Sequence, residues 1–317
     1  MKTIQFILAR SLGALATILV GALAVFLVMQ AAPGDPALAV LGEHATPEAV
    51  AAFRAEHHLD APLAARFLVW LKGFATGDLG RALTIAGGAS ISQLIANRLP
   101  NTTFIGLYAI FFSVGLSLLI GSLAAVSRGK LADTAVTSIA ALGVSMPDFW
   151  LGYVLIFFFA LNLAWLPSYG FTGPFESLQG ALLTGLLPAL AISAPMTAVF
   201  SRTLRTTLLE STQRDYVTVA RSFGFSQPFV FRHYVFRNSI IPYIVVVGLQ
   251  IRYLLGGVVI VERVFGVPGI GSLMVDAAFA RDYPVVQACT VVFLAIVMTV
   301  NLTVDIVCAV LDPKRTR

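Results

Sequence analysis

Long stretches without a charged residue limit what this chain can fold into. The uncharged runs cover residues 11–34, 99–127, 177–201, 238–251 and 283–304, and the run 134–175 contains only Asp148. A helix rises 1.5 Å per residue, so about 20 apolar residues cross a bilayer. The runs therefore predict an all-α polytopic membrane protein with six spans, at about 10–31, 100–126, 133–162, 181–207, 238–261 and 285–309.

Composition agrees with this prediction. Of the 317 residues, 58% are hydrophobic and 12% are charged, whereas about 25% of an average soluble domain is charged. No internal repeat or linker divides the sequence. We expect a single transmembrane domain over 1–317, with an external helical segment at 33–99 and a cytoplasmic loop at 208–237.

The basic residues indicate how the chain is oriented. With six spans, one side of the membrane receives Lys2 and Arg10, the pair at 128 and 130, six arginines of the loop 202–237, and the basic C-terminal tail. Basic residues mark the cytoplasmic side, so both termini are predicted to be cytoplasmic. Because these residues lie in loops bounded by spans, a nucleic-acid-binding patch is disfavoured.

The first apolar run raises the alternative of a cleaved signal peptide. It follows the basic residues Lys2 and Arg10, but it is longer than the 7–15 residues of a signal sequence. We therefore expect a retained first span.

The external segment predicts short helices. Thr46, Pro47 and Glu48 form a helix start, with an N-cap, a first-turn proline and an acid at the positive helix end, and the helix should run through His58. Pro62 opens a second, amphipathic helix, and Ser90 caps a third. The segment is too short for a core of its own, which favours a cap on the outer ends of the spans over a separate binding domain.

Motifs for chemistry are scarce. The sequence has no G-x-x-x-x-G-K-[ST] loop for ATP and no H-E-x-x-H or G-x-S-x-G run. His57 and His58 are adjacent, so on a helix they point about 100° apart, and no metal site is expected there. An intramembrane enzyme would need a nucleophile and base that the spans do not supply.

The loop after the fourth span is basic and rich in aromatics. A helix is expected from Asp215 to Phe223, ending at a C′ glycine, Gly224, and a second helix start is permitted by Pro228. Such a helix, held between two spans, could transmit force from a soluble partner. The residues alone leave equally open a helix that contacts anionic lipid.

This loop resembles the signature loop of importer permeases of the ATP-binding cassette superfamily, in which an alanine is followed four residues later by glycine, here Ala220 and Gly224. Other stretches, in the right order from about residue 4 to 315, are similar to the dipeptide, oligopeptide and nickel branch and its B-type subunit. They are 25–27 with 32–36, 77–80, 98–102, 145–152, 165–167, 261–271, 281–287 and 312–313.

The resemblance implies a bacterial inner-membrane permease subunit that forms half of a peptide pathway. The implied partners are a homologous second permease, two cytoplasmic ATPase subunits that bind ATP and Mg²⁺, and an external substrate-binding protein. No cofactor is implied in this chain. Nickel chelates, glutathione or oligosaccharides are alternative substrates, and a secondary transporter is the rival of another class. The implied coupling residues are Asp215, Tyr216, Ala220, Arg221, Gly224 and Phe225.

Two charges fall inside predicted spans, Asp148 in the third and Arg252 in the fifth. A charge at the bilayer centre costs about 2.5–3.5 kcal/mol on insertion scales, so such a group faces a wet cavity or a partner. Asp148 and Arg252 either line the pathway or form a structural ion pair. Pro147 should kink the third span. The candidate pathway residues are Pro147, Asp148, Trp150, Gln250, Arg252 and Glu262.

Overall fold

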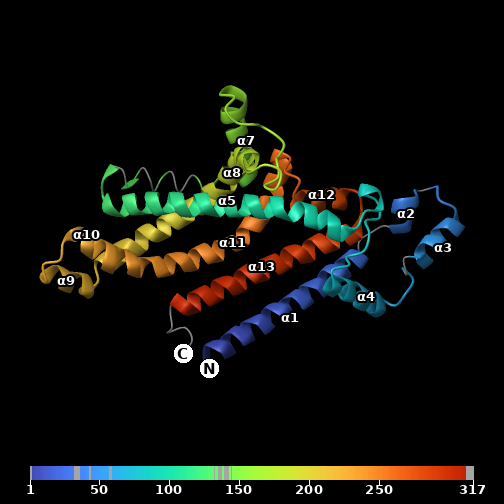
Figure 1. Ribbon diagram of the computed structural model, residues 1–317, viewed down its shortest axis with the longest axis horizontal. Helices are drawn as coiled ribbons and strands as arrows, with labels where there is room; N and C mark the ends of the chain where they lie inside the picture. The colour runs from blue at the N-terminus through green and yellow to red at the C-terminus, as the bar shows by residue number, and fades with distance from the viewer. Residues whose placement is uncertain are drawn as a thin grey trace. The chain divides into compact units, whose positions relative to one another are not determined.

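The chain is described by a computed structural model, which covers residues 2–31, 36–42, 44–56, 59–131, 133–134, 138, 143 and 145–311. Apart from one isolated bridge between Arg81 and Ser90, the regular structure in these residues is helical (Figure 1). The long helices are α1 (Lys2–Ala31), α5 (Ile91–Val126), α8 (Leu178–Thr212), α11 (Arg237–Phe265) and α13 (Tyr283–Leu311).

Shorter helices connect them. They are α2 (Pro36–Leu41), α3 (Pro47–Glu56), α4 (Leu63–Thr76), the 3₁₀ turn η1 (Ala86–Gly88), α7 (Asp148–Leu155), α9 (Asp215–Ser222), α10 (Gln227–Val230) and α12 (Ile270–Phe279). Two π-helical turns, η2 (Ile156–Asn162) and η3 (Phe231–Phe236), continue α7 and α10.

The helices confirm a polytopic all-α protein. Five helices in the described residues are long and apolar enough to cross a membrane, and a sixth is reached if Gly256–Phe265 and Ile270–Phe279 form one broken span. Of the predicted third span, 133–162, the apolar helix Asp148–Asn162 is described. Part of its first half (132, 135–137, 139–142 and 144) lies outside the described residues.

Two prolines behave differently from expectation. The helix that contains the second span begins before Pro100, because α5 starts at Ile91 and includes both Pro100 and the short helix predicted after Ser90. Pro147, predicted to kink the third span, instead has an extended backbone (φ −63°, ψ 142°) directly before α7. An extended residue cannot continue the helical hydrogen bonding, so a new helix begins at Asp148.

Backbone contacts divide the chain into two compact units. The first comprises residues 1–10, 103–267 and 299–317, and the second comprises 11–102 and 268–298. In the first unit, α8 and α11 pack against each other and against α7. Their buried side chains form one apolar core that includes Phe200, Leu204, Leu208, Val258 and Phe265.

In the second unit, α4 lies across α1 (Figure 1). Phe26 of α1 contacts Phe67 and Trp70 of α4, at ring-centroid distances of 5.3 and 6.2 Å. The predicted amphipathic helix after Pro62 is confirmed, and its aromatic side packs on the first span. Its opposite side exposes Leu68 and Val69.

Candidate functional site

The helix α9 has the ends that its sequence predicts. Asp215 lies in its first turn, where the helix dipole favours an acid. At its end, Gly224 N–H bonds to Arg221 O (2.9 Å) and Phe225 N–H to Ala220 O (3.4 Å), which is the Schellman pattern. Gly224 has φ +81°, a conformation that favours glycine. The glycine therefore turns the chain sharply from α9 into α10.

α9 has a buried side and an exposed side. Val217 and Ala220 are buried in the core formed with α8 and α11, together with Val230 and Val235. By contrast, every residue from 221 to 229 is exposed, and Phe223 retains 78% of its accessible surface. The chain thus presents an aromatic surface that its own core does not cover.

A hydrogen bond attaches α9 to α8, and further hydrogen bonds join α8 to η3 and to α11. The Tyr216 and Ser211 hydroxyls are 2.6 Å apart, and Ser211 donates to Val235 O at 3.2 Å. The Ser239 hydroxyl donates to Thr207 O at 3.0 Å. α8, α9, η3 and α11 are therefore linked, and a displacement of α9 would be transmitted to two membrane helices.

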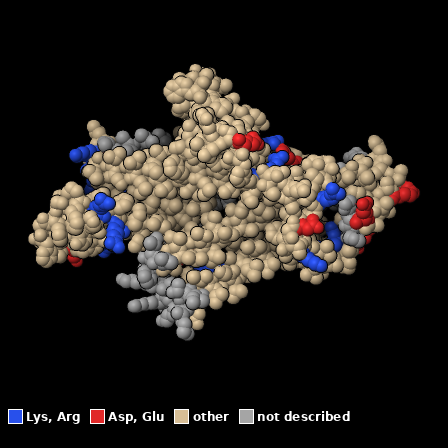
Figure 2. Space-filling view, in the orientation of Figure 1, with Lys and Arg blue, Asp and Glu red and all other residues tan. Residues whose placement is uncertain are grey.

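The exposed turn is aromatic and basic. Phe225 and Phe229 lie 5.0 Å apart, and Phe229 stacks on His233 at 4.2 Å. Figure 2 shows basic side chains gathered at the α9–α10 end of the first unit. The exposed arginines of this region are Arg202, Arg214, Arg221, Arg232 and Arg237.

The structure brings the predicted coupling residues together on this turn. Asp215, Arg221, Gly224 and Phe225 are exposed. Tyr216 is partly covered by its bond to Ser211, and Ala220 is buried. We define the exposed residues 221–229 as the α9–α10 surface.

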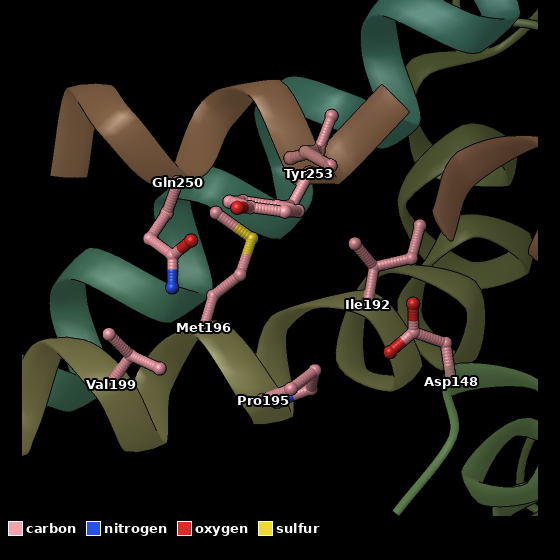
Figure 3. Close-up of a pocket in the computed structure, with 8 residues that line it drawn as sticks. Asp148, Ile192, Pro195, Met196, Val199, Gln250 and Tyr253 are labelled. Atoms are coloured by element: carbon pink, nitrogen blue, oxygen red, sulfur yellow. The ribbon is translucent and has the colours of Figure 1, made fainter. Parts of the chain in front are cut away.

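A second feature of the first unit is a cavity of about 390 Å³ between α7, α8 and α11 (Figure 3). Its volume lies in the range typical of small-molecule sites. The lining is apolar except for the Asp148 carboxylate, the Gln250 amide and the Tyr253 hydroxyl. The lining residues are Asp148, Ile192, Pro195, Met196, Val199, Gln250, Tyr253 and Leu254.

Two of the predicted pathway residues, Asp148 and Gln250, line this cavity. Pro147 directly precedes Asp148 and starts α7. Trp150 is 46% exposed and is not among the lining residues, and Glu262 is fully buried further along α11. The side chain of Arg252 lies outside the described residues, so its predicted relation to Asp148 stays a prediction.

Sequence reasoning missed the apolar wall of the cavity. Ile192, Pro195, Met196 and Val199 recur at helical spacing along α8. That periodicity could have identified one face of the span, but a face toward lipid carries the same pattern. Only the packing of α7, α8 and α11 shows that this face of α8 lines a cavity rather than contacting lipid.

In the second unit, two of the stretches that resemble the importer branch contact each other. Asn101 donates to Pro268 O at 2.9 Å, and Ile270 N–H donates to the Thr102 hydroxyl at 2.8 Å. Thr102 thereby satisfies a free N–H at the start of α12. These contacts give Asn101 and Thr102 a structural role in positioning the turn before α12.

The Asp282 carboxylate anchors a loop of the segment 33–99, which was predicted to be external. Its Oδ2 accepts from the N–H groups of Leu83, Thr84 and Ile85 at 2.8, 2.7 and 3.1 Å, and also from the Thr84 hydroxyl at 3.2 Å. Asp282 is fully buried. The sequence offered no signal for this contact, because its partners are backbone amides almost 200 positions away.

In the described residues, no group of three His, Cys, Asp or Glu side chains could hold a metal ion. His44 is exposed, whereas His57 and His58 lie outside the residues that the structure describes.

Comparison with known proteins identifies the family. Residues 117–317 match the family described as binding-protein-dependent transport system inner membrane component, and residues 3–105 match the N-terminal region of such membrane components. The chain belongs to this family. It is therefore a multi-pass inner-membrane permease subunit of an ATP-binding cassette importer.

Relatives extend over nearly the whole chain. A probable peptide ABC transporter permease of Sinorhizobium fredii is 35% identical, covering 98% of both chains, and a putative peptide transport system permease of Brucella abortus is 37% identical, covering 97% of this chain and 98% of the relative. The glutathione permease GsiC of Salmonella choleraesuis is 34% identical, covering 98% of both.

Solved structures agree on the fold. A chain of the inward-facing MetNI methionine ABC transporter matches with a TM-score of 0.54 and 18% identity, covering 69% of this chain and 97% of the other. A chain of an amino acid ABC transporter, crystallised with histidines, matches with a TM-score of 0.50 and 15% identity. The match covers 70% of this chain and 94% of the other.

Proposed function

We propose that this permease subunit carries short peptides across the inner membrane and is driven by ATPase subunits that dock on the α9–α10 surface. The observation that carries the coupling role is that surface, where residues 221–229 are exposed while Val217 and Ala220 fix α9 to the membrane core. Apolar aromatic groups surrounded by charges are typical of protein interfaces.

The proposed assembly has a homologous second permease, two ATPases that bind ATP and Mg²⁺, and an external binding protein. In it, this chain contributes half of the pathway and holds no cofactor of its own. The peptide assignment is supported by the relatives named as peptide permeases at 35–37% identity. Glutathione, itself a short peptide, is the second candidate, because one relative is named as its permease.

The test is ATP-dependent uptake by the complete complex in proteoliposomes. Substituting Phe223→Ala removes the most exposed aromatic of the α9–α10 surface. Aromatic contacts at the centre of an interface typically contribute about 2 kcal/mol or more, so ATPase binding and uptake should fall at least tenfold. Labelled dipeptide and glutathione, supplied separately, distinguish the two substrates.

A matched control is Phe175→Ala, which removes a similarly exposed aromatic (89%, against 78% for Phe223) from the loop before α8. Uptake should be unchanged in this variant. Unimpaired ATPase binding in Phe223→Ala would contradict the docking role. Uptake without any ATPase, driven by an ion gradient, would instead indicate a secondary transporter.

A further inference from the structure

We propose that the cavity between α7, α8 and α11 binds the ammonium end of the transported peptide through Asp148. This inference rests on the proposed peptide transport and adds a selectivity for a free amine. Its starting point is the composition of the lining, in which one carboxylate faces a largely apolar wall.

Asp148 has no hydrogen-bond or ion-pair partner among the side chains and backbone groups that the structure describes. A carboxylate in a membrane segment is expensive unless a cation or water accompanies it. A cationic ligand that enters the cavity would supply that charge.

The missing side chain at Gly257 leaves room for the Asp148 carboxylate against α11. A Cβ built on Gly257 would lie 2.5 Å from Asp148 Oδ2. Any other residue at 257 would therefore displace the carboxylate from this position. The glycine leaves the carboxylate beside the cavity rather than filling the space with a side chain.

The remaining lining suits the rest of a peptide. Figure 3 shows the Gln250 amide extending from α11 toward α8, beside Met196 and Val199. The amide can donate to a peptide carbonyl and accept from a peptide N–H. The wall formed by Ile192, Met196 and Val199 offers an apolar surface for a side chain of the ligand. The site thus fits a short peptide with a free ammonium group and an apolar residue.

The experiment measures weak binding of alanyl-leucine and N-acetyl-alanyl-leucine to the purified complex in nanodiscs, by saturation-transfer NMR. The external binding protein is omitted, so its own selectivity does not contribute. A hydrogen-bonded ion pair should make the free dipeptide bind about tenfold more tightly than the acetylated one. Equal binding of the two by the wild-type complex would overturn the proposal.

Variants then assign the preference to Asp148. Asp148→Asn should remove the tenfold difference, and Asp148→Glu should retain part of it. Glu176→Gln, which neutralises an exposed acid in the loop before α8, should leave it intact. If Asp148→Asn does not assemble, the wild-type comparison and Asp148→Glu still decide the question.

Two further outcomes separate the alternatives. In the first, Asp148→Asn and Arg252→Gln both weaken assembly, and the double variant Asp148→Arg with Arg252→Asp restores it. If the preference for the free amine also survives in Asp148→Asn, Asp148 is a structural residue and the proposal is wrong. If the wild-type complex takes up no peptide in the presence of ATP, the proposed function itself is wrong.

Discussion

At the scale of single residues, Asp282 makes the most concentrated polar contact of the second unit. Three successive backbone N–H groups, of Leu83, Thr84 and Ile85, converge on one of its carboxylate oxygens. Hydrogen bonds to a charged acceptor contribute more than neutral ones, and a buried donor that loses its partner is costly. Asp282 therefore anchors residues 83–85 of an irregular loop to the start of α13.

Asp282→Asn should destabilise the protein by about 2 kcal/mol, because the amide oxygen is a weaker acceptor and carries no charge. The thermal transition of the detergent-solubilised chain should fall by a few degrees. As a control, Asp60→Asn removes an exposed carboxylate whose ion pair with Arg54 is 3.0 Å long, and exposed pairs contribute about 0–1 kcal/mol. Equal thermal transition temperatures for Asp282→Asn and Asp60→Asn would contradict the anchoring role.

At the scale of elements, the left-handed glycine after α9 determines the direction of the next helix. Gly224→Ala should strain the turn by about 1 kcal/mol and tilt the α9–α10 surface. We expect weaker stimulation of ATPase activity by substrate, measured on the reconstituted complex, with little change in the thermal transition.

The matched control is Gly129→Ala. Gly129 has a similar φ of +76° in the turn after α5, so the backbone strain is comparable but lies outside the α9–α10 surface. If both variants reduce stimulation equally, general strain rather than the docking geometry explains the effect.

An ion pair joins the loop after α5 to α8. Arg205 Nε and Nη2 donate to the two oxygens of Asp133 at 2.6 and 2.7 Å. The Asp133 side chain is 10% exposed and the Arg205 side chain 27%, so removing one partner leaves the other charge without its paired hydrogen bonds and should destabilise the protein. We expect Asp133→Asn to lower the thermal transition of the complex.

The charge-reversed pair, Asp133→Arg with Arg205→Asp, provides the control. It should regain part of the lost stability because an ion pair can form again. The loss of stability in the double variant could instead exceed the sum of the losses in the two single variants. That result would show that the position needs these particular side chains rather than a pair of opposite charges.

Sequence predicted the elements well where the signal was local. The start of α9 at Asp215, its end before Gly224 and the helix after Pro62 follow from capping and periodicity. The continuation of one helix through Pro100 was not predicted, because a proline usually ends a helix; α5 continues through it, as membrane helices can where neighbouring groups satisfy the freed carbonyl. The partners of Asp282 and the wall facing Asp148 depend on contacts between distant segments, which no local pattern encodes.

At the scale of the whole molecule, one contact bears on topology. Arg10, near the start of α1, lies 3.4 Å from Asp305, near the end of α13. Residues near the two ends of the chain therefore lie at the same depth, which requires an even number of crossings. The five long helices need one more crossing. The predicted span at 133–162, with its apolar helix Asp148–Asn162, is our candidate for it, in which case the bent pair Gly256–Phe265 and Ile270–Phe279 is not a separate crossing.

We expect both termini to lie in the cytoplasm, because basic loops mark that side of the membrane. Alkaline phosphatase, active only outside the inner membrane, should be active when fused after Glu176 and inactive when fused after Gln213. A green fluorescent protein at the C-terminus should fluoresce. Phosphatase activity of the Gln213 fusion alone would show that the orientation is the reverse of the predicted one. The α9–α10 surface would then lie outside, away from any cytoplasmic ATPase. Activity at both positions would mean that α8 does not cross, and would reduce the crossings to an odd number that the Arg10–Asp305 contact does not permit.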